Sequence, residues 1–360
     1  MGYTSVVLDD IRSQLAPADV VLKEARQRRD IVRRASESFV GVLKSYGSGS
    51  LAHGTANCPI HRRDKGLDAD CGVVLDRRVH QSLGPDSEEN VGPDRTVAAV
   101  LEHLRPKVLT QYPAATFEIT KRALFIEFHE PMASGEDPTV DLVVGLRRRD
   151  EGLWIPNTEQ HRWDPSHPEK HTELLTAEPK SFRVTRARAI RLAKAENKRP
   201  GRRPNPPLCS FNLEALALMF VQQGQGVPAA LLQLWESGAK DLARRNTPDP
   251  AGVSAPIKVS DRDYAVERLT QAAGTLRAAL ECDDDEYQVR GHLSRLWPDF
   301  VAPTPFGETK ARVAARLQAG KPLAVTSVGT LAATGSALKQ PRSFGARGSM
   351  RSARPTGSSD

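Results

Sequence analysis

The chain of 360 residues is long enough for two domains with sizeable hydrophobic cores and some unstructured remainder. It contains no run of roughly 18 apolar residues, which a membrane span requires, and its first residues lack the pattern of a secretory signal. The four cysteines are far apart and form no C-x-x-C pair, which argues against a disulfide framework and a simple zinc site. We therefore expect a cytoplasmic protein without a membrane partner.

The formal net charge of +7 is unevenly distributed along the chain. Nine Lys and Arg residues after residue 300, against two acidic residues, account for the whole excess, so residues 1–300 carry no net charge. Binding to a nucleic-acid duplex depends largely on neutralising its phosphates. The folded body therefore shows no strong sign of nucleic-acid binding.

Strands and helices are mixed in the first part of the chain. Apolar residues at helical spacing predict a long helix over residues 16–40 and a second over 94–109, with Asp94 as its N-cap. Short apolar runs rich in valine or aromatic residues predict strands. These strands are expected at 70–76, at 140–146, and as a pair within 115–128 that is connected at Lys121 and Arg122.

The second part of the chain favours helices separated by joints rich in proline and glycine. They are expected at residues 182–197, 210–223, 227–243 and 261–281. Beyond about residue 325 the composition is rich in Gly, Ser, Arg and Pro, with too little apolar surface to fold. We therefore divide the chain into a mixed core (residues 1–155), a helical domain (156–324) and a disordered basic tail (325–360).

Asp68 and Asp70 lie two residues apart on a predicted strand, so their side chains share one face of the sheet. Carboxylates held this close repel each other unless a cation lies between them. Their hard oxygen ligands suit Mg²⁺ or Mn²⁺, and two such ions can hold the attacking and leaving oxygens of a nucleotidyl transfer. Asp141, which follows Val140 on another predicted strand, is the candidate for a third carboxylate.

Gly49 and Ser50 precede this strand in the sequence GSGSLAHGT. A glycine permits close approach of the backbone to a phosphate, and the following residues could begin a helix whose N-terminus favours anions. Alone, a Gly-Ser pair is most often a simple turn, and an Asp-x-Asp pair is more often solvated or capping. Their order and their placement relative to the strands favour a nucleotide-binding function.

The combination of GSGSLAHGT, DADCGVVL and VDLVV resembles the polymerase-beta-like nucleotidyltransferase superfamily, and in particular its bacterial cyclic-oligonucleotide synthases. The resemblance extends to RAIRLAKAEN and CSFNLEALAL, and it implies that Lys194 and Ser210 hold the donor triphosphate with Gly49 and Ser50. It also implies an α+β fold in which a nucleotidyltransferase core with a mixed sheet is followed by a helical domain that completes the active-site cleft. The lysine segment departs from the family by having Ala195 and Glu196 where a tryptophan often follows.

Two further groups of residues carry less weight. His161, His167 and His171 could be imagined as metal ligands, but packing or capping around the neighbouring prolines is the better interpretation. The basic run at 147–149 could meet nucleotide phosphates or form a solvated turn.

The resemblance implies a metal-dependent nucleotidyltransferase that joins ATP or other ribonucleoside triphosphates into a cyclic di- or trinucleotide second messenger. It further implies a role in bacterial anti-phage signalling, with a regulatory or effector protein as partner. Two alternatives stay open: nucleotide transfer to RNA or to a small-molecule acceptor, and a catalytically inactive binding scaffold.

Overall fold

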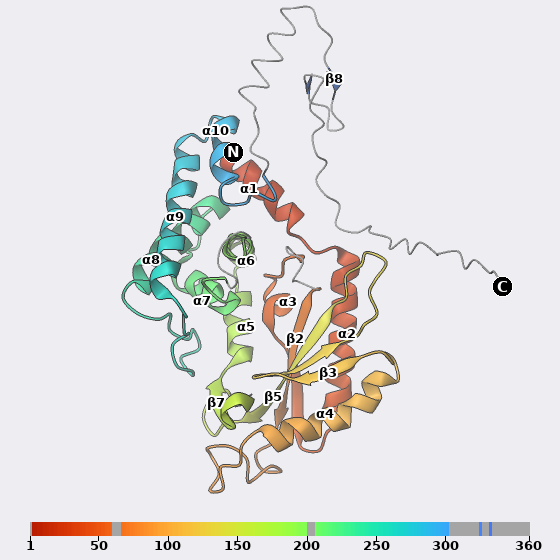
Figure 1. The fold of residues 1–360 in the computed structure, drawn as a ribbon. Coiled ribbons are helices and arrows are strands. Elements are labelled where there is room, and N and C mark those ends of the chain that lie inside the picture. Colours follow the sequence, from red (N-terminus) through yellow and green to blue (C-terminus); the bar gives the residue numbers. More distant parts are fainter. Residues whose placement is uncertain (1, 60–65, 200–205, 302–323, 326–330, 333–360) are drawn as a thin grey trace, which may run out of the picture.

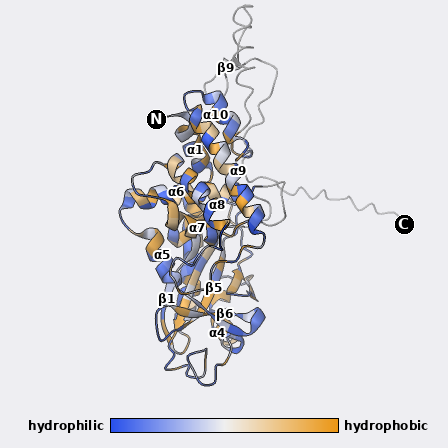
Figure 2. Ribbon diagram, turned by 90° about the vertical axis from the view of Figure 1, so that its left-hand side faces the viewer, coloured by the Kyte–Doolittle hydropathy of each residue, from blue (hydrophilic) through white to orange (hydrophobic). Residues whose placement is uncertain are grey.

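The computed structural model describes residues 2–59, 66–199, 206–301, 324–325 and 331–332. Figure 1 shows two halves: a mixed β-sheet with helices on one face, and a bundle of helices that packs beside it. Figure 2 shows hydrophobic residues on the strands of the sheet and stripes of hydrophobic and hydrophilic residues along the helices. Each half has its own hydrophobic core.

The sheet has seven strands in the described part of the chain, and five of them follow the order β1-β2-β5-β4-β3. The strands are β1 (Val42–Gly47), β2 (Asp68–Leu75), β3 (Thr116–Ile119), β4 (Leu124–Glu127), β5 (Thr139–Arg147), β6 (Leu153–Asn157) and β7 (Arg162–Ser166). β2 and β5 are parallel, whereas their other neighbours are antiparallel. The mixed sheet expected from the sequence is confirmed.

Alternation along the two central strands decides which side chains are buried. On β2 the odd-numbered residues, such as Cys71 and Val73, face α2 (Asp19–Glu37) and α4 (Asp94–Leu109) in the core of the sheet half. Val140 and Leu142 of β5 enter the same core. Burying such side chains contributes about 1.5 to 3 kcal/mol each. The intervening residues of both strands, including the three predicted aspartates, are therefore turned to the opposite face of the sheet.

A buried arginine fixes the segment that leads into β5. Arg28 of α2 donates to the carbonyl oxygens of Glu130 and Pro138, at 2.7 Å and 2.8 Å, and pairs with Asp137. Its guanidinium also lies 4.8 Å from the centre of the Phe128 ring. The start of β5, where Asp141 lies, is thus tied to the helix behind the sheet.

The helical half is built around a second core that includes Trp235 and Trp297, whose rings stack 5.9 Å apart. Its helices are α1 (Tyr3–Gln14), α5 (Pro168–Thr176), α6 (Lys180–Asn197), α7 (Ser210–Phe220), α8 (Val227–Leu242), α9 (Arg262–Glu281) and α10 (Glu286–Leu293). Val7, Leu8 and Ile11 of α1 are buried in this core. The first helix of the chain therefore packs with the helical half, although α2 packs with the sheet.

Most predicted elements are confirmed, with shifts of a few residues at their ends. Asp94 is the first residue of α4 and Pro93 is the N-cap, so the prediction of Asp94 as N-cap was wrong. Local sequence patterns did not predict α1, β1, β6, β7, α5 and α10. Because β6 and β7 continue the sheet to Ser166, residue 155 lies within a strand.

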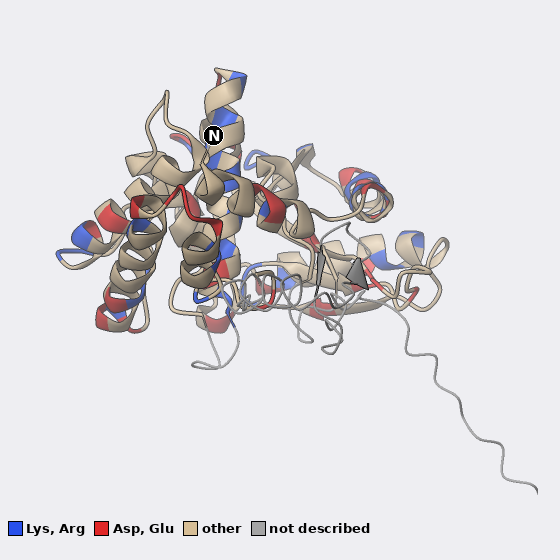
Figure 3. Cartoon of the chain, turned by 90° about the horizontal axis from the view of Figure 1, so that it is seen from above, with Lys and Arg blue, Asp and Glu red and all other residues tan. Residues whose placement is uncertain are grey.

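The tail predicted at residues 325–360 lies outside the described residues, apart from parts of two short paired strands, β8 (Ala324–Val325) and β9 (Leu331–Ala332). Among the described helices, none combines the length and the hydropathy needed to cross a membrane. Figure 3 shows acidic and basic residues interspersed over both halves, which agrees with a body that is not broadly basic.

Candidate active site

The two central strands bring the predicted carboxylates together on one face of the sheet. Asp70 of β2 lies directly opposite Asp141 of β5 in the parallel register, and neighbouring strands are about 4.8 Å apart. Asp68 lies two residues before Asp70 on β2, opposite Thr139, whose hydroxyl donates to Asp68 Oδ1 at 2.6 Å. All three aspartates that the sequence singled out therefore lie close together on one face of the sheet.

The electrostatics of this site reflect crowding of like charges. Burial, together with the negative charges of Asp141 and Asp68, raises the pKa of Asp70 to about 7. Burial also raises the pKa of Asp141 to about 6, with the charge of Asp68 contributing. Both carboxylates are thus held in a setting that disfavours their charged form.

Three carboxylates with this mutual repulsion fit a divalent cation in their chemistry, because hard oxygen ligands are what Mg²⁺ and Mn²⁺ prefer. Within the described ranges, however, no set of three or more His, Cys, Asp or Glu side chains is arranged as a ready metal site. One oxygen of Asp68 accepts the hydrogen bond from Thr139, and the three side chains are neighbours that are not arranged as a metal-binding group. The prediction that they bridge metal ions stays a prediction.

The Gly-Ser turn packs directly against these carboxylates. Gly49 begins the five-residue helix α3 (Gly49–His53) with φ +66°, and a Cβ at this position would overlap the Asp70 carboxylate. The amide of Ser48 donates to the Asp70 carbonyl oxygen at 3.0 Å. Only glycine fits here, because the backbone approaches Asp70 closely, and the predicted contact of Gly49 with a phosphate stays a prediction.

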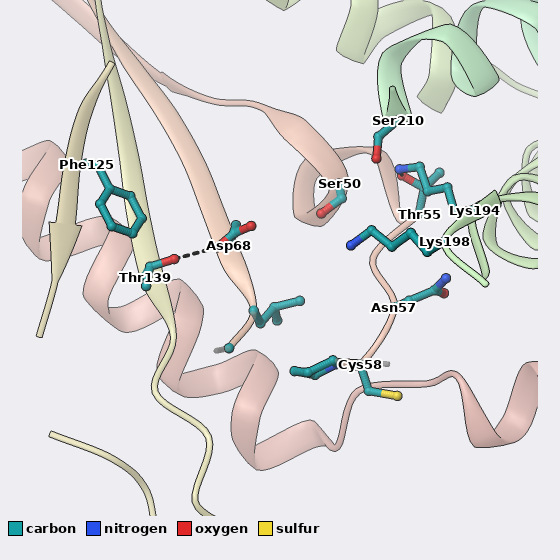
Figure 4. A pocket seen from close by; sticks show the side chains of 13 residues that line it. Ser50, Thr55, Asn57, Cys58, Asp68, Phe125, Thr139, Lys194, Lys198 and Ser210 are labelled. Carbon is teal, nitrogen blue, oxygen red and sulfur yellow. Dashed lines mark hydrogen bonds between the residues drawn. The ribbon is translucent and has the colours of Figure 1, made fainter. Parts of the chain in front are cut away.

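A cavity of about 340 Å³ opens beside the turn, between the sheet half and the helical half (Figure 4). Three predicted phosphate-binding residues line it: Ser50, Lys194 and Ser210. Asp68 lines it as well, so the cavity adjoins the carboxylates. Other residues that line it were not identified from the sequence, and they include Thr55, Asn57, Cys58, Phe125, Thr139 and Lys198.

The two lysines at the cavity differ in their surroundings. Lys194 of α6 is only 6% exposed, and its Nζ donates to Glu214 Oε1 at 2.7 Å and to Thr55 Oγ1 at 3.0 Å. Lys198, one helical turn later, is exposed, and its amine points into the cavity toward Ser50 in Figure 4. The signal in the sequence was the i, i+4 spacing of the two lysines, which places both on one face of the helix.

Phe125 supplies an aromatic surface next to the carboxylates. It is paired with Asp141 across β4 and β5, and it lines the cavity. Its neighbours Leu124 and Ile126 point into the core, so the alternation of the strand directs Phe125 to the face that carries the aspartates. A base or ribose held at Asp141 would meet this ring.

The remaining candidates lie outside the site. His161 contacts Asp94, His167 caps α5, and His171 bonds to Asp249 at 2.6 Å, which confirms packing and capping roles for these histidines. In the basic run at 147–149, the Arg149 amide and guanidinium both bond to Asp86. This run follows Asp141 by six residues, at the other end of β5.

The chain has an α+β fold in which a mixed-sheet core is followed by a helical domain, and this fold is similar to that of CD-NTases. Among solved structures it is similar to the CD-NTase CdnG of Bradyrhizobium diazoefficiens in complex with GTP, at 17% identity and a TM-score of 0.59, over 82% of this chain and 96% of that one. It is also similar to CdnC of E. coli MS115-1 with ATP, at 16% identity and a TM-score of 0.57, over 84% and 99%.

A third similar structure is the cyclic AMP-GMP synthase DncV of Vibrio cholerae in complex with the linear intermediate pppA(3',5')pG. The identity is 13% and the TM-score is 0.53, over 83% of this chain and 87% of that one. No protein-family model and no curated protein matches the sequence. The similarity therefore lies in the fold, as the resemblance noted from the sequence motifs implied.

Proposed function

We propose that this protein is a metal-dependent nucleotidyltransferase that joins ribonucleoside triphosphates into a cyclic oligonucleotide and releases pyrophosphate. The observation that carries the proposal is the meeting of Asp68, Asp70 and Asp141 on one face of the sheet beside the Gly49–Ser50 turn and the cavity. The solved structures of the same fold, which hold GTP, ATP or a linear dinucleotide intermediate, support nucleoside triphosphates as substrates.

The carboxylates divide the work at the reacting centre. Asp68, Asp70 and Asp141 would hold Mg²⁺ or Mn²⁺, which would stabilise charge on the transferring phosphate. Asp141 also orients the attacking ribose hydroxyl and accepts its proton. The hydroxyl oxygen forms a bond to the α-phosphorus, the bond from that phosphorus to the pyrophosphate breaks, and pyrophosphate leaves.

The rest of the cavity binds and orients the two nucleotides. Ser50 and Ser210 donate to the donor triphosphate, and Lys198 brings positive charge to it from α6. Lys194, which the resemblance placed on the triphosphate, anchors this helix through Glu214. Phe125 stacks on the acceptor nucleotide next to Asp141.

A cytoplasmic location, a role in anti-phage signalling and control by a partner protein belong to the same proposal. They follow from the resemblance to bacterial cyclic-oligonucleotide synthases. The similar CdnC has also been solved as a complex with a HORMA protein, which supports a regulatory partner for this chain.

The test is to incubate the purified full chain with all four ribonucleoside triphosphates and Mg²⁺ or Mn²⁺, and to identify the products by mass spectrometry. We expect a cyclic di- or trinucleotide and pyrophosphate, and no product after chelation of the metal. A ladder of linear RNA, or a nucleotide attached to an added small acceptor, would replace the proposed reaction by one of the alternatives. Triphosphates recovered unchanged under all these conditions would favour an inactive scaffold.

A further inference from the structure

Glu214 of α7 is a buried carboxylate that does not line the cavity but contacts two residues that do. It is 4% exposed, and it accepts hydrogen bonds from Thr55 Oγ1 at 2.6 Å and from Lys194 Nζ at 2.7 Å. Its second oxygen lies 3.1 Å from Nδ1 of His53. The three partners come from both halves of the molecule. His53 ends the short helix α3 that begins at the Gly-Ser turn and Thr55 follows it, whereas Lys194 belongs to α6.

The arrangement keeps Glu214 ionised. Burial alone would raise its pKa, but the Lys194 charge and the hydrogen bond with His53 outweigh burial and hold the pKa at about 2. A buried carboxylate is costly unless it is paired and hydrogen-bonded, and here each oxygen has a partner. This ionised group therefore makes a strong connection between the turn and the helix.

We propose that Glu214 is a positioning residue for triphosphate binding, which holds the Gly-Ser turn of the sheet half against α6 of the helical half. The proposal rests on the proposed function. Each anchor is one backbone hydrogen bond away from a cavity residue: the amide of Thr55 donates to the Ser50 carbonyl, and the amide of Lys198 donates to the Lys194 carbonyl. Glu214 thereby sets the spacing between Ser50 and Lys198.

Neighbouring contacts extend this connection along the same segment. Asn57, which lines the cavity, exchanges two hydrogen bonds with Arg191 of α6, one to its backbone carbonyl and one from its guanidinium. Nε2 of His53 lies 3.2 Å from the Thr172 hydroxyl of α5. The segment from His53 to Asn57 is thus bonded to helices α5, α6 and α7, and Glu214 is the acidic member of this set of contacts.

The chain offers a matched comparison for a purely structural ion pair. Glu196 lies two residues after Lys194 on the same helix, is 3% exposed and pairs with the buried Arg268 of α9. It is not among the residues that line the cavity. A change at Glu196 therefore disturbs a buried ion pair of α6 without touching the Gly-Ser turn.

The experiment compares Glu214→Gln with Glu196→Gln in the full chain, at a temperature where both variants are folded by circular dichroism. Equilibrium titration with ATP and Mg²⁺ gives the Kd, and the product assay gives KM and kcat. We expect both variants to lower the Tm, but only Glu214→Gln to raise the Kd and KM, by about tenfold, with kcat within about threefold of wild type. The tenfold loss corresponds to about 1.4 kcal/mol of binding free energy.

Thr55→Val is the second variant, because it removes one hydrogen bond to Glu214 and leaves the charges in place. We expect it to raise the Kd for ATP by about threefold. An unchanged or lower Kd in Glu214→Gln would overturn the proposal, since a carboxylate that merely repels the triphosphate would be relieved by the change. An equal increase of the Kd for ATP in Glu214→Gln and Glu196→Gln would assign Glu214 a structural role only.

The two proposals can fail separately. A wild-type protein that binds ATP but makes no cyclic product fails as a synthase, while the Kd comparison still decides the role of Glu214. A wild-type protein that makes the product, with the same Kd in Glu214→Gln, overturns the positioning role alone. A wild-type protein that binds no triphosphate overturns both.

Discussion

The aspartates at the sheet and the buried Glu214 lie on either side of the Gly-Ser turn, and their environments shift the carboxylate pKa in opposite directions. At the sheet, burial and like charges raise the pKa of Asp70 to about 7 and that of Asp141 to about 6. At the helical half, burial is outweighed by Lys194 and His53, and the pKa of Glu214 falls to about 2. We call Asp68, Asp70 and Asp141 the crowded group, because their like charges repel one another. We call Glu214 and its hydrogen-bond partners the satisfied group, because both oxygens of Glu214 are hydrogen-bonded.

The two groups also differ in their hydrogen bonds, which indicates that the crowded group needs a ligand and the satisfied group does not. Glu214 has donors on both oxygens, whereas the Asp70 carboxylate receives no hydrogen bond from any residue in the described part of the chain. Negative charge that is unfavourable in the folded protein alone is stabilised when a divalent cation binds to it. The following experiments test that separation, beginning with the largest expected effect.

Asp70→Asn and Asp141→Asn break the crowded group. Each removes a charge while keeping the shape, and we expect product formation to fall by about a thousandfold, as when a charge-stabilising group is lost from an active site. The Tm should not fall, because a repulsive charge has been removed. Steady-state kinetics and thermal melts measure the two effects.

Asp76→Asn is the control for these variants, since Asp76 directly follows β2 and pairs with the exposed Arg78. Its activity should stay near that of wild type. Near-normal turnover in both Asp70→Asn and Asp141→Asn would show that the crowded group is not the reacting centre.

Lys194→Met breaks the satisfied group. Removing one partner of a buried pair leaves the other charge uncompensated, and we expect a loss of about 3 to 5 kcal/mol in the free energy of unfolding. Urea unfolding measures it. A stability equal to that of wild type would mean that the contact with Glu214 contributes little to the fold.

Lys198→Met is the matched change one helical turn away. Because Lys198 is exposed at the cavity, we expect the free energy of unfolding to change by less than about 0.5 kcal/mol. The KM for ATP should rise by about tenfold, with a smaller change in kcat, since a point charge on the triphosphate is lost. If Lys194→Met raised KM and Lys198→Met did not, the roles assigned to the two lysines would be reversed.

The smallest expected effect is the pH dependence of stability in the presence of a chelator. Raised pKa values mean that folded Asp70 and Asp141 bind a proton more tightly than the unfolded chain does. The contribution of these two groups to the stability of the folded protein is therefore full below pH 3.8, and it is lost as the pH rises through about 6 and 7. We expect the Tm to fall by a few degrees between pH 5 and pH 8, and less so in Asp70→Asn.

Adding Mg²⁺ should restore more of the Tm at pH 8 than at pH 5, because only the ionised carboxylates bind the ion. The contribution of Glu214 to folding stability has the opposite pH dependence. It is present above pH 4.5 and is lost as the pH falls toward 2. A Tm that does not depend on Mg²⁺ at either pH would count against a metal at the crowded group.

The parts of the molecule that could be predicted from the sequence are those that depend on the pattern of neighbouring residues. Valine-rich runs predicted the central strands, and the Asp-x-Asp spacing predicted that Asp68 and Asp70 share a face. Gly49 was correctly identified as a position of close approach, although the group that approaches it is Asp70. In each case the physical cause lies within a few residues of the chain or in strand alternation.

The rest depended on contacts between distant segments. Glu214 lies about 160 residues from its partners in the turn, at a sequence separation of 159 from Thr55, and nothing near it in the sequence indicates that contact. Phe125 became a site residue through its pairing with Asp141. Lys198 was missed because helical spacing alone does not show which of two lysines is already engaged by a buried carboxylate.

The placement of α1 has a mechanical consequence. Since α1 packs in the helical half and α2 in the sheet half, the described chain crosses between the halves both at residues 15–18 and between β7 and α5. Two bodies joined by one linker can move in many directions, whereas two separated linkers restrict their relative motion mainly to rotation about the line that joins the linkers. We expect nucleotides to enter and leave the cavity during such a rotation of the two halves.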